Sequence, residues 1–126
     1  MIDDARTEVV FDLHAQVCQA IGHPKRMQIL ELLREGERCV CEMGPALGLR
    51  QANVSQHLAI LRSAGVVLSR REGVWIHYRV ADPRIFTAID LMRELIASQM
   101  GETHALVEAW RNTRPADQAQ CAAQEV

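Results

Sequence analysis

The sequence of 126 residues has no run of eighteen apolar residues, so it predicts no transmembrane helix. Its first residues lack the basic-then-apolar order of a secretory signal, and we expect a cytoplasmic protein. In a chain without an export signal, the four cysteines favour reduced thiols over a disulfide scaffold. Neither a Cys/His/Asp constellation nor a phosphate-binding glycine loop is present, which argues against an enzyme.

Acidic residues are missing from Met43 to Arg71, although the whole chain has a formal net charge of −2. The arginines inside this window are Arg50, Arg62, Arg70 and Arg71. A phosphate backbone favours such a positive stretch because binding releases counterions, and arginine suits bidentate contacts with phosphate and guanine. The window is therefore a candidate DNA-binding segment, although a solvated face with four charges would have the same composition.

Apolar residues at helical spacing predict five helices within one domain, residues 1–111. The expected helices cover about residues 8–21, 24–35, 39–47, 51–63 and 83–111. The Ala/Gln-rich tail at 112–126 is expected to be disordered. The last helix has two apolar stripes, one for the domain's own core and one that needs a partner, which predicts a homodimer. These stripes are Ile85, Ile89, Met92, Ile96 and Met100, and Ala88, Leu91 and Leu95.

The helices at 39–47 and 51–63 are joined by the tight turn Gly48-Leu49, which is a helix-turn-helix pattern. The second helix has an apolar face and an outward face of small and amide side chains, a kind that the major groove accepts. The apolar face is Val54, Leu58 and Leu61, and the outward face is Ala52, Ser55, Gln56 and Ala59. An ordinary surface hairpin of two helices would show the same pattern.

A predicted β-hairpin follows this helix pair and decides between the two interpretations. Its strands cover residues 66–71 and 74–80, around a tip at Glu72-Gly73. Arg70 and Arg71 flank the tip, so the hairpin projects positive charge. A helix-turn-helix followed by a basic two-stranded wing predicts a mainly α, winged helix-turn-helix fold.

Cys39 occupies the N-cap position of the helix expected at 39–47, where Ser, Thr, Asp or Asn is usual, and Glu42 takes the capping-box position. Cys41 follows two residues later. The first-turn amides and the positive end of the helix dipole favour a thiolate here, which makes it a better nucleophile and metal ligand. The alternative is that both cysteines are small buried apolar residues. We interpret the pair as a sensor.

Two thiolates do not complete a site for a thiophilic ion, because arsenite takes three sulfurs and cadmium takes four ligands. Cys18 is the best third candidate, since it lies off the apolar stripe of the first helix. His14 lies one turn earlier on the same face, so a Cys/Cys/Cys/His site is conceivable. Alternatively, Cys18 fills a gap between helices and His14 is solvated. The third ligand can come from the same subunit or from another one.

The chain resembles the ArsR/SmtB family of bacterial repressors over roughly residues 13–96. The matching segments are Ala20-Ile21-Gly22-His23-Pro24-Lys25-Arg26, Cys39-Val40-Cys41-Glu42, Asn53-Val54-Ser55-Gln56-His57-Leu58, and Arg70-Arg71-Glu72-Gly73 with Tyr78. The resemblance implies a dimeric repressor that binds double-stranded operator DNA when free of inducer and leaves it when inducer binds. It implies DNA contacts by Gln51, Asn53, Ser55, Gln56, His57, Arg70 and Arg71, and the acid-free window adds Arg62 as a DNA-binding candidate. A structural role fits His57 about as well.

The Cys-Val-Cys segment is similar to the site of the arsenic, antimony, cadmium and lead sensors. It implies no cofactor in the DNA-bound state and As(III) or Sb(III) as the inducer ion, with Cd(II) or Pb(II) next. In arsenic sensors of this type another cysteine often stands at the position of Gly44. The zinc-sensing branch has Asp and His ligands on the last helix. Here Asp90 is matched, but Met92 takes the His position and His104 is out of register, which argues against a zinc site there.

Side chains at positions i and i+2 of a regular helix do not face each other, so an ion that binds both Cys39 and Cys41 must distort the first helical turn. That distortion would lower the affinity for DNA. A disulfide within the pair is disfavoured for the same geometric reason. The alternative function is a thiol-redox or persulfide-responsive repressor that uses Cys18 with Cys39 or Cys41.

Overall fold

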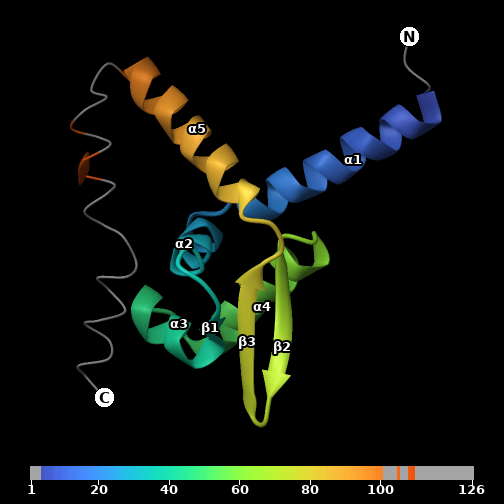
Figure 1. Cartoon of the computed structure of the whole chain (residues 1–126). Coiled ribbons are helices and arrows are strands. Elements are labelled where there is room, and N and C mark those ends of the chain that lie inside the picture. The colour runs from blue at the N-terminus through green and yellow to red at the C-terminus, as the bar shows by residue number, and fades with distance from the viewer. Residues whose placement is uncertain (1–3, 101–104, 106–107, 110–126) are drawn as a thin grey trace.

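A computed structural model describes residues 4–100, 105, 108 and 109, and Figure 1 shows the arrangement of its helices and strands. The helices are α1 (Asp4–Ile21), α2 (Pro24–Leu32), α3 (Val40–Leu47), α4 (Gln51–Ser63) and α5 (Arg84–Met100), and the strands are β1 (Arg38–Cys39), β2 (Val67–Glu72) and β3 (Trp75–Val80). No helix in these described ranges is long and apolar enough to cross a membrane. The tail at 112–126, Gly101 and His104 lie outside the described residues.

The predicted helices within this range are confirmed, with small shifts at their ends. The first helix starts at Asp4, four residues before the predicted start, and it ends at Ile21 as the following glycine indicates. The next helix begins at Pro24, whose missing N–H costs nothing in a first turn. Arg26 links the two helices, because its Nη1 donates to the carbonyl oxygens of Gln19 at 3.2 Å and Ala20 at 2.9 Å.

The core lies between α2, α3, α4 and the base of the hairpin. Its largest fully buried side chains are Ile29, Leu30, Leu33, Met43, Val54, Leu58, Leu61 and Val67. The predicted apolar face of α4 supplies three of these eight, so that face is confirmed as core. The opposite face of α4 is thereby turned to solvent.

Two glycines make the turn between α3 and α4 tight. Gly48 has a φ of 67°, in the left-handed region that favours glycine, and its amide donates to the carbonyl of Gly44. A Cβ atom at Gly44 would lie only 2.8 Å from the backbone oxygen of Leu49. A cysteine at position 44 would therefore force this turn to shift.

The wing is part of a three-stranded antiparallel sheet with strand order β1-β3-β2, where a two-stranded hairpin was predicted. The additional strand β1 pairs Arg38 with Tyr78 and Cys39 with His77. The tip also differs by one residue, because Glu72 pairs with Trp75 and the loop is Gly73-Val74. Gly73 has a φ of 63°, the left-handed backbone that such a two-residue loop requires.

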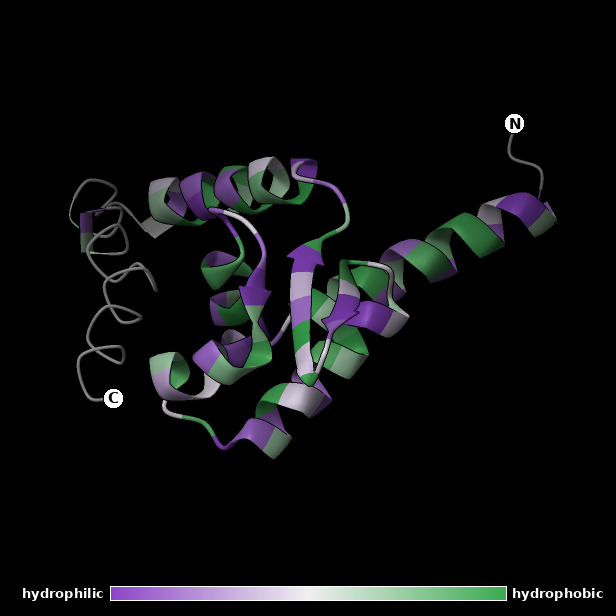
Figure 2. Ribbon diagram, turned by 60° about the horizontal axis from the view of Figure 1, so that its bottom comes forward, coloured by the Kyte–Doolittle hydropathy of each residue, from purple (hydrophilic) through white to green (hydrophobic). Residues whose placement is uncertain are grey.

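Helices α1 and α5 project from the core on the side away from the wing tip (Figure 1). The core side of α5 carries Phe86 and Ile89. The first predicted stripe of α5 reaches the core only at Ile85 and Ile89, whereas Met92 and Ile96 of the same stripe are exposed. Figure 2 shows hydrophobic positions along both projecting helices. The exposed large apolar residues there are Val9, Val10, Phe11, Leu13, Leu91, Met92, Leu95 and Ile96.

The core side of α5 is polar where it meets α2, which explains the break in its apolar stripe. Arg34, in the turn after α2, binds Asp90 of α5 through two hydrogen bonds, of 3.0 and 2.9 Å. Glu31 accepts from Arg34 at 2.8 and 2.9 Å and from Arg93 of α5 at 2.6 Å. Asp90, the residue that matches the zinc-ligand pattern of the resemblance, is thus held in an ion-pair cluster.

Candidate DNA-binding surface and thiol pair

The outward face of α4 presents most of the predicted DNA-binding residues to solvent. Gln51, Asn53, Ser55, Gln56 and Arg62 are all exposed. Their positions follow from the buried apolar face on the other side of the same helix. The N-cap residue, Arg50, makes no side-chain hydrogen bond to the first turn. Helix amides left without a side-chain cap favour an anion such as a phosphate.

His57 lies apart from this exposed set. Its ring is half-buried and packs on the ring of His23, with 4.7 Å between the ring centroids. Its Nδ1 is buried and has no hydrogen-bond partner among the described residues. Burial, and then the charges of His23 and Arg26, lower the pKa of His57. This environment fits the structural role for His57 better than a contact with DNA.

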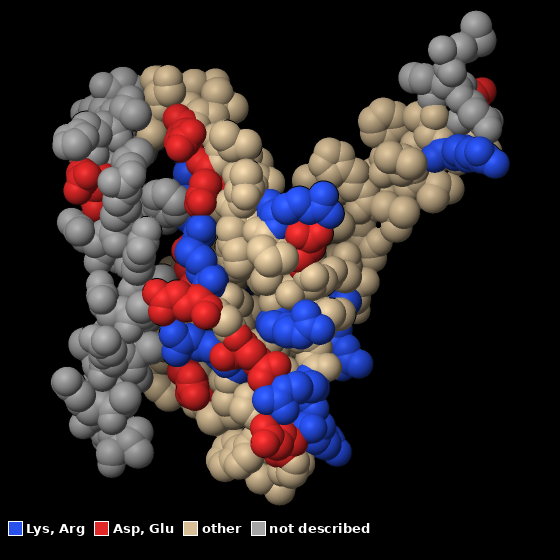
Figure 3. Space-filling view, viewed as in Figure 1, with Lys and Arg blue, Asp and Glu red and all other residues tan. Residues whose placement is uncertain are grey.

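The two wing arginines differ in their surroundings. Arg71 is exposed and forms no ion pair within the described ranges. Arg70 is bound by two carboxylates, with its Nη2 2.6 Å from Glu37 and its Nη1 3.0 Å from Glu72. Figure 3 shows acidic side chains interspersed among the basic ones on this side of the molecule. The stretch that lacks acids in the sequence is therefore not free of acids in space.

The sulfur atoms of Cys39 and Cys41 face each other at a distance of 2.6 Å. Cys39 is the N-cap of α3, as predicted, and its Sγ accepts a hydrogen bond from the Cys41 amide at 3.4 Å. Its backbone is extended, with a φ of −74° and a ψ of 142°. The geometric argument from a regular helix is therefore wrong, because Cys39 precedes the helix and its side chain folds over the first turn. The same finding removes the geometric objection to a disulfide between Cys39 and Cys41.

The expected capping box is replaced by an ion pair. A Glu42 carboxylate oxygen lies 3.5 Å from Nη1 of Arg38, one turn earlier. Arg38 also donates from its Nε to the carbonyl oxygen of Leu32 at 2.8 Å, so it is anchored to α2. These contacts hold the segment that enters α3 between α2 and the sheet.

Cys41 is a thiol at neutral pH, in contrast to the thiolate expected from the helix dipole. Desolvation of its sulfur and the hydrogen bond with Cys39 raise the pKa of Cys41 to about 11. Cys39 is buried and Cys41 is exposed, so one sulfur of the pair is open to a ligand from solvent. Because a metal binds the deprotonated sulfur, any ion that takes this pair must displace a proton.

Among the described residues of one protomer, no third ligand joins the pair. No group of three His, Cys, Asp or Glu side chains in the described part of the chain is placed to hold a metal ion. Cys18 and His14 are exposed on α1, a helix that packs on α2 and α4. Of the predicted metal ligands, the structure therefore brings together Cys39 and Cys41 and leaves Cys18 apart.

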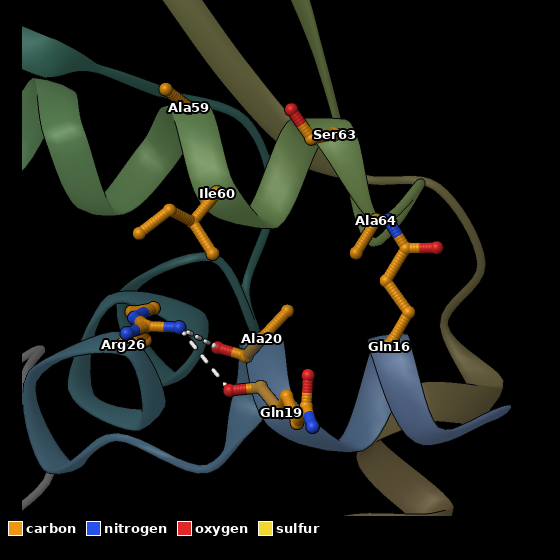
Figure 4. A pocket seen from close by; sticks show the side chains of 8 residues that line it. All are labelled: Gln16, Gln19, Ala20, Arg26, Ala59, Ile60, Ser63 and Ala64. Atoms are coloured by element: carbon orange, nitrogen blue, oxygen red, sulfur yellow. Dashed lines mark hydrogen bonds between the residues drawn. The ribbon is translucent and has the colours of Figure 1, made fainter. Parts of the chain in front are cut away.

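A shallow groove lies between α1 and α4, lined by Gln16, Gln19, Ala20, Arg26, Ala59, Ile60, Ser63 and Ala64 (Figure 4). It contains no cysteine and none of the predicted DNA-binding residues. The hydrogen bonds of Arg26 at its floor satisfy carbonyl groups at the end of α1, a structural role. We therefore assign this groove no part in either surface.

Comparison with known proteins identifies a family. Residues 23–69 match the family model described as bacterial regulatory protein, arsR family. An uncharacterised HTH-type transcriptional regulator of Mycobacterium tuberculosis is 37% identical over 106 residues, which are 83% of this chain and 93% of that protein. The arsenic resistance transcriptional regulator ArsR1 of Pseudomonas putida is 39% identical over 108 residues, 83% of each chain.

Two solved structures have the same fold. One is the crystal structure of that M. tuberculosis regulator, with a TM-score of 0.66, 37% identity and coverage of 74% of this chain and 94% of its own. The other is the solution structure of a homodimeric winged helix-turn-helix DNA-binding domain from Mycobacterium bovis. It has a TM-score of 0.68, 34% identity and coverage of 82% of this chain and 94% of its own. These likenesses confirm the winged helix-turn-helix fold.

The raised pKa of Cys41 predicts a pH-dependent reactivity. In a Cys18→Ser/Cys121→Ser background, we expect the alkylation rate of Cys41 to rise with pH along a curve with its midpoint near 11, rather than at the ordinary value of 9.0. Adding Cys39→Ala removes the sulfur that bonds Cys41, so the midpoint should fall toward 9.0. Mass spectrometry of the modified residue measures both curves. Midpoints near 9.0 in both variants would contradict the assignment.

Proposed function

The chain belongs to the ArsR family of bacterial regulatory proteins, and on that premise we propose that it is a cytoplasmic homodimeric repressor that leaves its operator when a thiophilic ion binds Cys39 and Cys41. The observation that carries the proposal is the facing pair of sulfur atoms at the start of α3. That helix packs on α4, the helix with the exposed amide face. The sensing groups and the DNA-binding helix are thus neighbours in one small core.

Operator binding rests on α4 and the wing. The exposed side chains of α4 enter the major groove, where Gln51, Asn53 and Gln56 can pair with adenine edges. Ser55 and Arg62 contact bases or the DNA backbone from the same face, and Arg70 and Arg71 of the wing contact phosphates. His57 supports α4 from the core side, against His23.

A homodimer accounts for the exposed apolar faces of α1 and α5. Large apolar side chains on both helices are more than half exposed in the single chain, among them Phe11 at 63% and Leu91 at 60%. Contiguous apolar surface of this kind marks an interface. The related M. bovis domain is homodimeric. A dimer places two α4 helices to read the two halves of one operator.

Arsenite or antimonite is the inducer that the donor set favours, with cadmium or lead next. Thiolates select soft ions, and a trigonal ion needs only one sulfur beyond the pair. We assign that third position to Cys18 of a second copy of the chain, since Cys18 is exposed on α1 and does not join the pair in its own protomer. The relative from P. putida is named an arsenic resistance regulator, which supports the same ion class.

Ion binding changes the start of α3 without moving the two sulfurs far. The ion takes the place of the Cys41 proton and claims the lone pairs of Cys39 that cap the Cys41 amide at 3.4 Å. The first turn of α3 loses that cap, and its packing against α4 changes. Binding energy spent on this change lowers the affinity for operator, and operator must weaken ion binding by the same factor.

Thiol oxidation is the second candidate, and the short distance between the sulfurs favours it. Two thiols become one disulfide when an oxidant such as a peroxide accepts two electrons and two protons. The partners are Cys39 with Cys41, or Cys18 with either of them. In contrast to ion binding, this chemistry stops when oxidant is removed.

Operator binding predicts losses at two chosen side chains. Gln56→Ala should weaken operator binding by about 1–3 kcal/mol, the usual size of a bidentate base contact. Arg71→Ala should weaken it and also reduce the slope of log affinity against log salt by roughly one unit, because one phosphate contact is lost. Fluorescence anisotropy with an operator duplex measures both. Gln28→Ala, an exposed residue of α2, is the matched control. Wild-type affinity in both test variants would contradict the DNA-binding surface.

Ion sensing predicts loss of induction in single thiol variants. Under anaerobic, reducing conditions, arsenite should release wild-type protein from operator and produce ultraviolet sulfur-to-ion charge-transfer absorption. Cys39→Ser and Cys41→Ser should each abolish release while retaining operator binding, and Cys18→Ser should weaken release. Cys121→Ser is the control and should respond normally. Release that needs oxidant, with a crosslinked peptide by mass spectrometry, would replace ion sensing by the redox candidate.

A further inference from the structure

One row of side chains crosses all three strands and joins the thiol pair to the wing. Cys39 of β1 lies opposite His77 of β3, and His77 lies opposite Arg70 of β2. Residues directly opposite each other in an antiparallel sheet have their side chains on the same face. The sensing sulfur and a wing arginine therefore share one face of the sheet. A change in the position of β1 would therefore alter its pairing with β3, the strand of the wing that pairs with β2.

The residue two places before Cys39 binds the guanidinium of Arg70. Glu37 accepts from Nε of Arg70 at 2.8 and 2.9 Å, and its Oε1 lies 2.6 Å from Nη2. Glu72 accepts from the remaining Nη1 at 3.0 Å. These hydrogen bonds lower the pKa of Glu37 and raise that of Arg70, so both groups stay charged at any pH near neutrality.

The two carboxylates occupy the edges that a guanidinium uses to bind a phosphate. Arginine recognises carboxylate and phosphate with the same pair of parallel N–H donors, so one edge cannot serve both at once. Arg71 next to it has no such partner among the described residues. Arg71 is ready for a phosphate, whereas Arg70 first has to leave a carboxylate.

We propose that Glu37 regulates operator affinity by competing with a DNA phosphate for Arg70, and that an ion on Cys39 and Cys41 strengthens this competition. The second half rests on the function proposed above. Without the ion, Cys39 is held by strand pairing, a long 3.4 Å cap and the thiol hydrogen bond from Cys41, so Glu37 can yield Arg70 to DNA. With the ion, both sulfurs are fixed to one centre and Glu37 stays opposite the wing.

The position of Glu37 explains why the ion has this effect. A ligand shifts an equilibrium only if it favours one state. Only Arg38 separates Glu37 from Cys39, and Arg38 is itself anchored on Leu32 and Glu42. Tethering Cys39 to Cys41 therefore further restricts the backbone of residues 37–39, which Arg38 already holds in place. The wing with Arg70 still bound to Glu37 is the state that this tether favours.

The test is a double-mutant cycle on operator binding by the full chain, first without any ion. Glu37→Gln keeps the size of the side chain and removes its charge, and it should tighten operator binding by about two- to fivefold, the range expected when one surface ion pair is removed. Arg70→Ala should weaken binding and reduce the salt slope by roughly one unit. In the Arg70→Ala background, Glu37→Gln should have no further effect beyond that of the control.

The control is Glu35→Gln, which removes the same charge two residues earlier. Glu35 is exposed and has no ion pair in the described part of the chain, so its change reports only the general loss of negative charge near DNA. Equal gains for Glu37→Gln and Glu35→Gln would overturn the competition. An undiminished gain for Glu37→Gln in the Arg70→Ala background would overturn it as well. Circular dichroism melting checks that each variant is folded.

The second arm adds arsenite under anaerobic conditions. Glu37→Gln should bind arsenite as wild type does, by the charge-transfer absorption, but arsenite should weaken its operator binding less, by about the same two- to fivefold factor. An unchanged factor would overturn the link between the thiols and the wing. If no thiophilic ion releases the wild-type protein, the proposed function fails, whereas the ion-free cycle still decides whether Glu37 competes for Arg70.

Discussion

At Cys39 the chain passes from strand β1 into helix α3, and its extended backbone serves both elements at once. The extension lets the residue pair with His77 in the sheet, and it turns the sulfur back over the helix onto Cys41. A helical conformation at this residue would break the strand pair and separate the sulfurs. The sheet, the cap of α3 and the thiol pair therefore depend on one backbone conformation.

This arrangement suits a switch because the resting state is held by weak bonds. A thiol is a poor hydrogen-bond acceptor, so the 3.4 Å cap stabilises α3 less than a serine cap would. The protonated Cys41 keeps negative charge out of a region that already contains Glu37 and Glu42. An ion with high affinity for sulfur therefore gains two strong bonds to sulfur and replaces only a weak cap and a thiol proton. The α3 helix then carries the change to α4, and β1 carries it to the wing.

Much of the fold was predictable because regular apolar spacing marks buried faces. The core face of α4 and the exposed amide face opposite it follow from the same period, and the position of Cys39 as a cap was predicted from Glu42 three residues later. Strand β1 has two residues, too few for any alternation to be read. Neither predicted stripe of α5 lies in the core along its whole length, because polar pairs such as Arg34–Asp90 replace apolar contacts there. The pairing of Arg70 with Glu37 joins residues 33 positions apart and leaves no sequence pattern.

The central claim is that ion binding at the thiols and operator binding oppose each other, and thermodynamic linkage gives the most direct test. The measurement is the affinity of arsenite for the free protein and for the protein saturated with operator duplex, by titration of the charge-transfer absorption under reducing conditions. Operator should weaken arsenite binding by the same factor by which arsenite weakens operator binding, typically about 5- to 150-fold. Equal arsenite affinity in the presence and absence of operator would contradict the account.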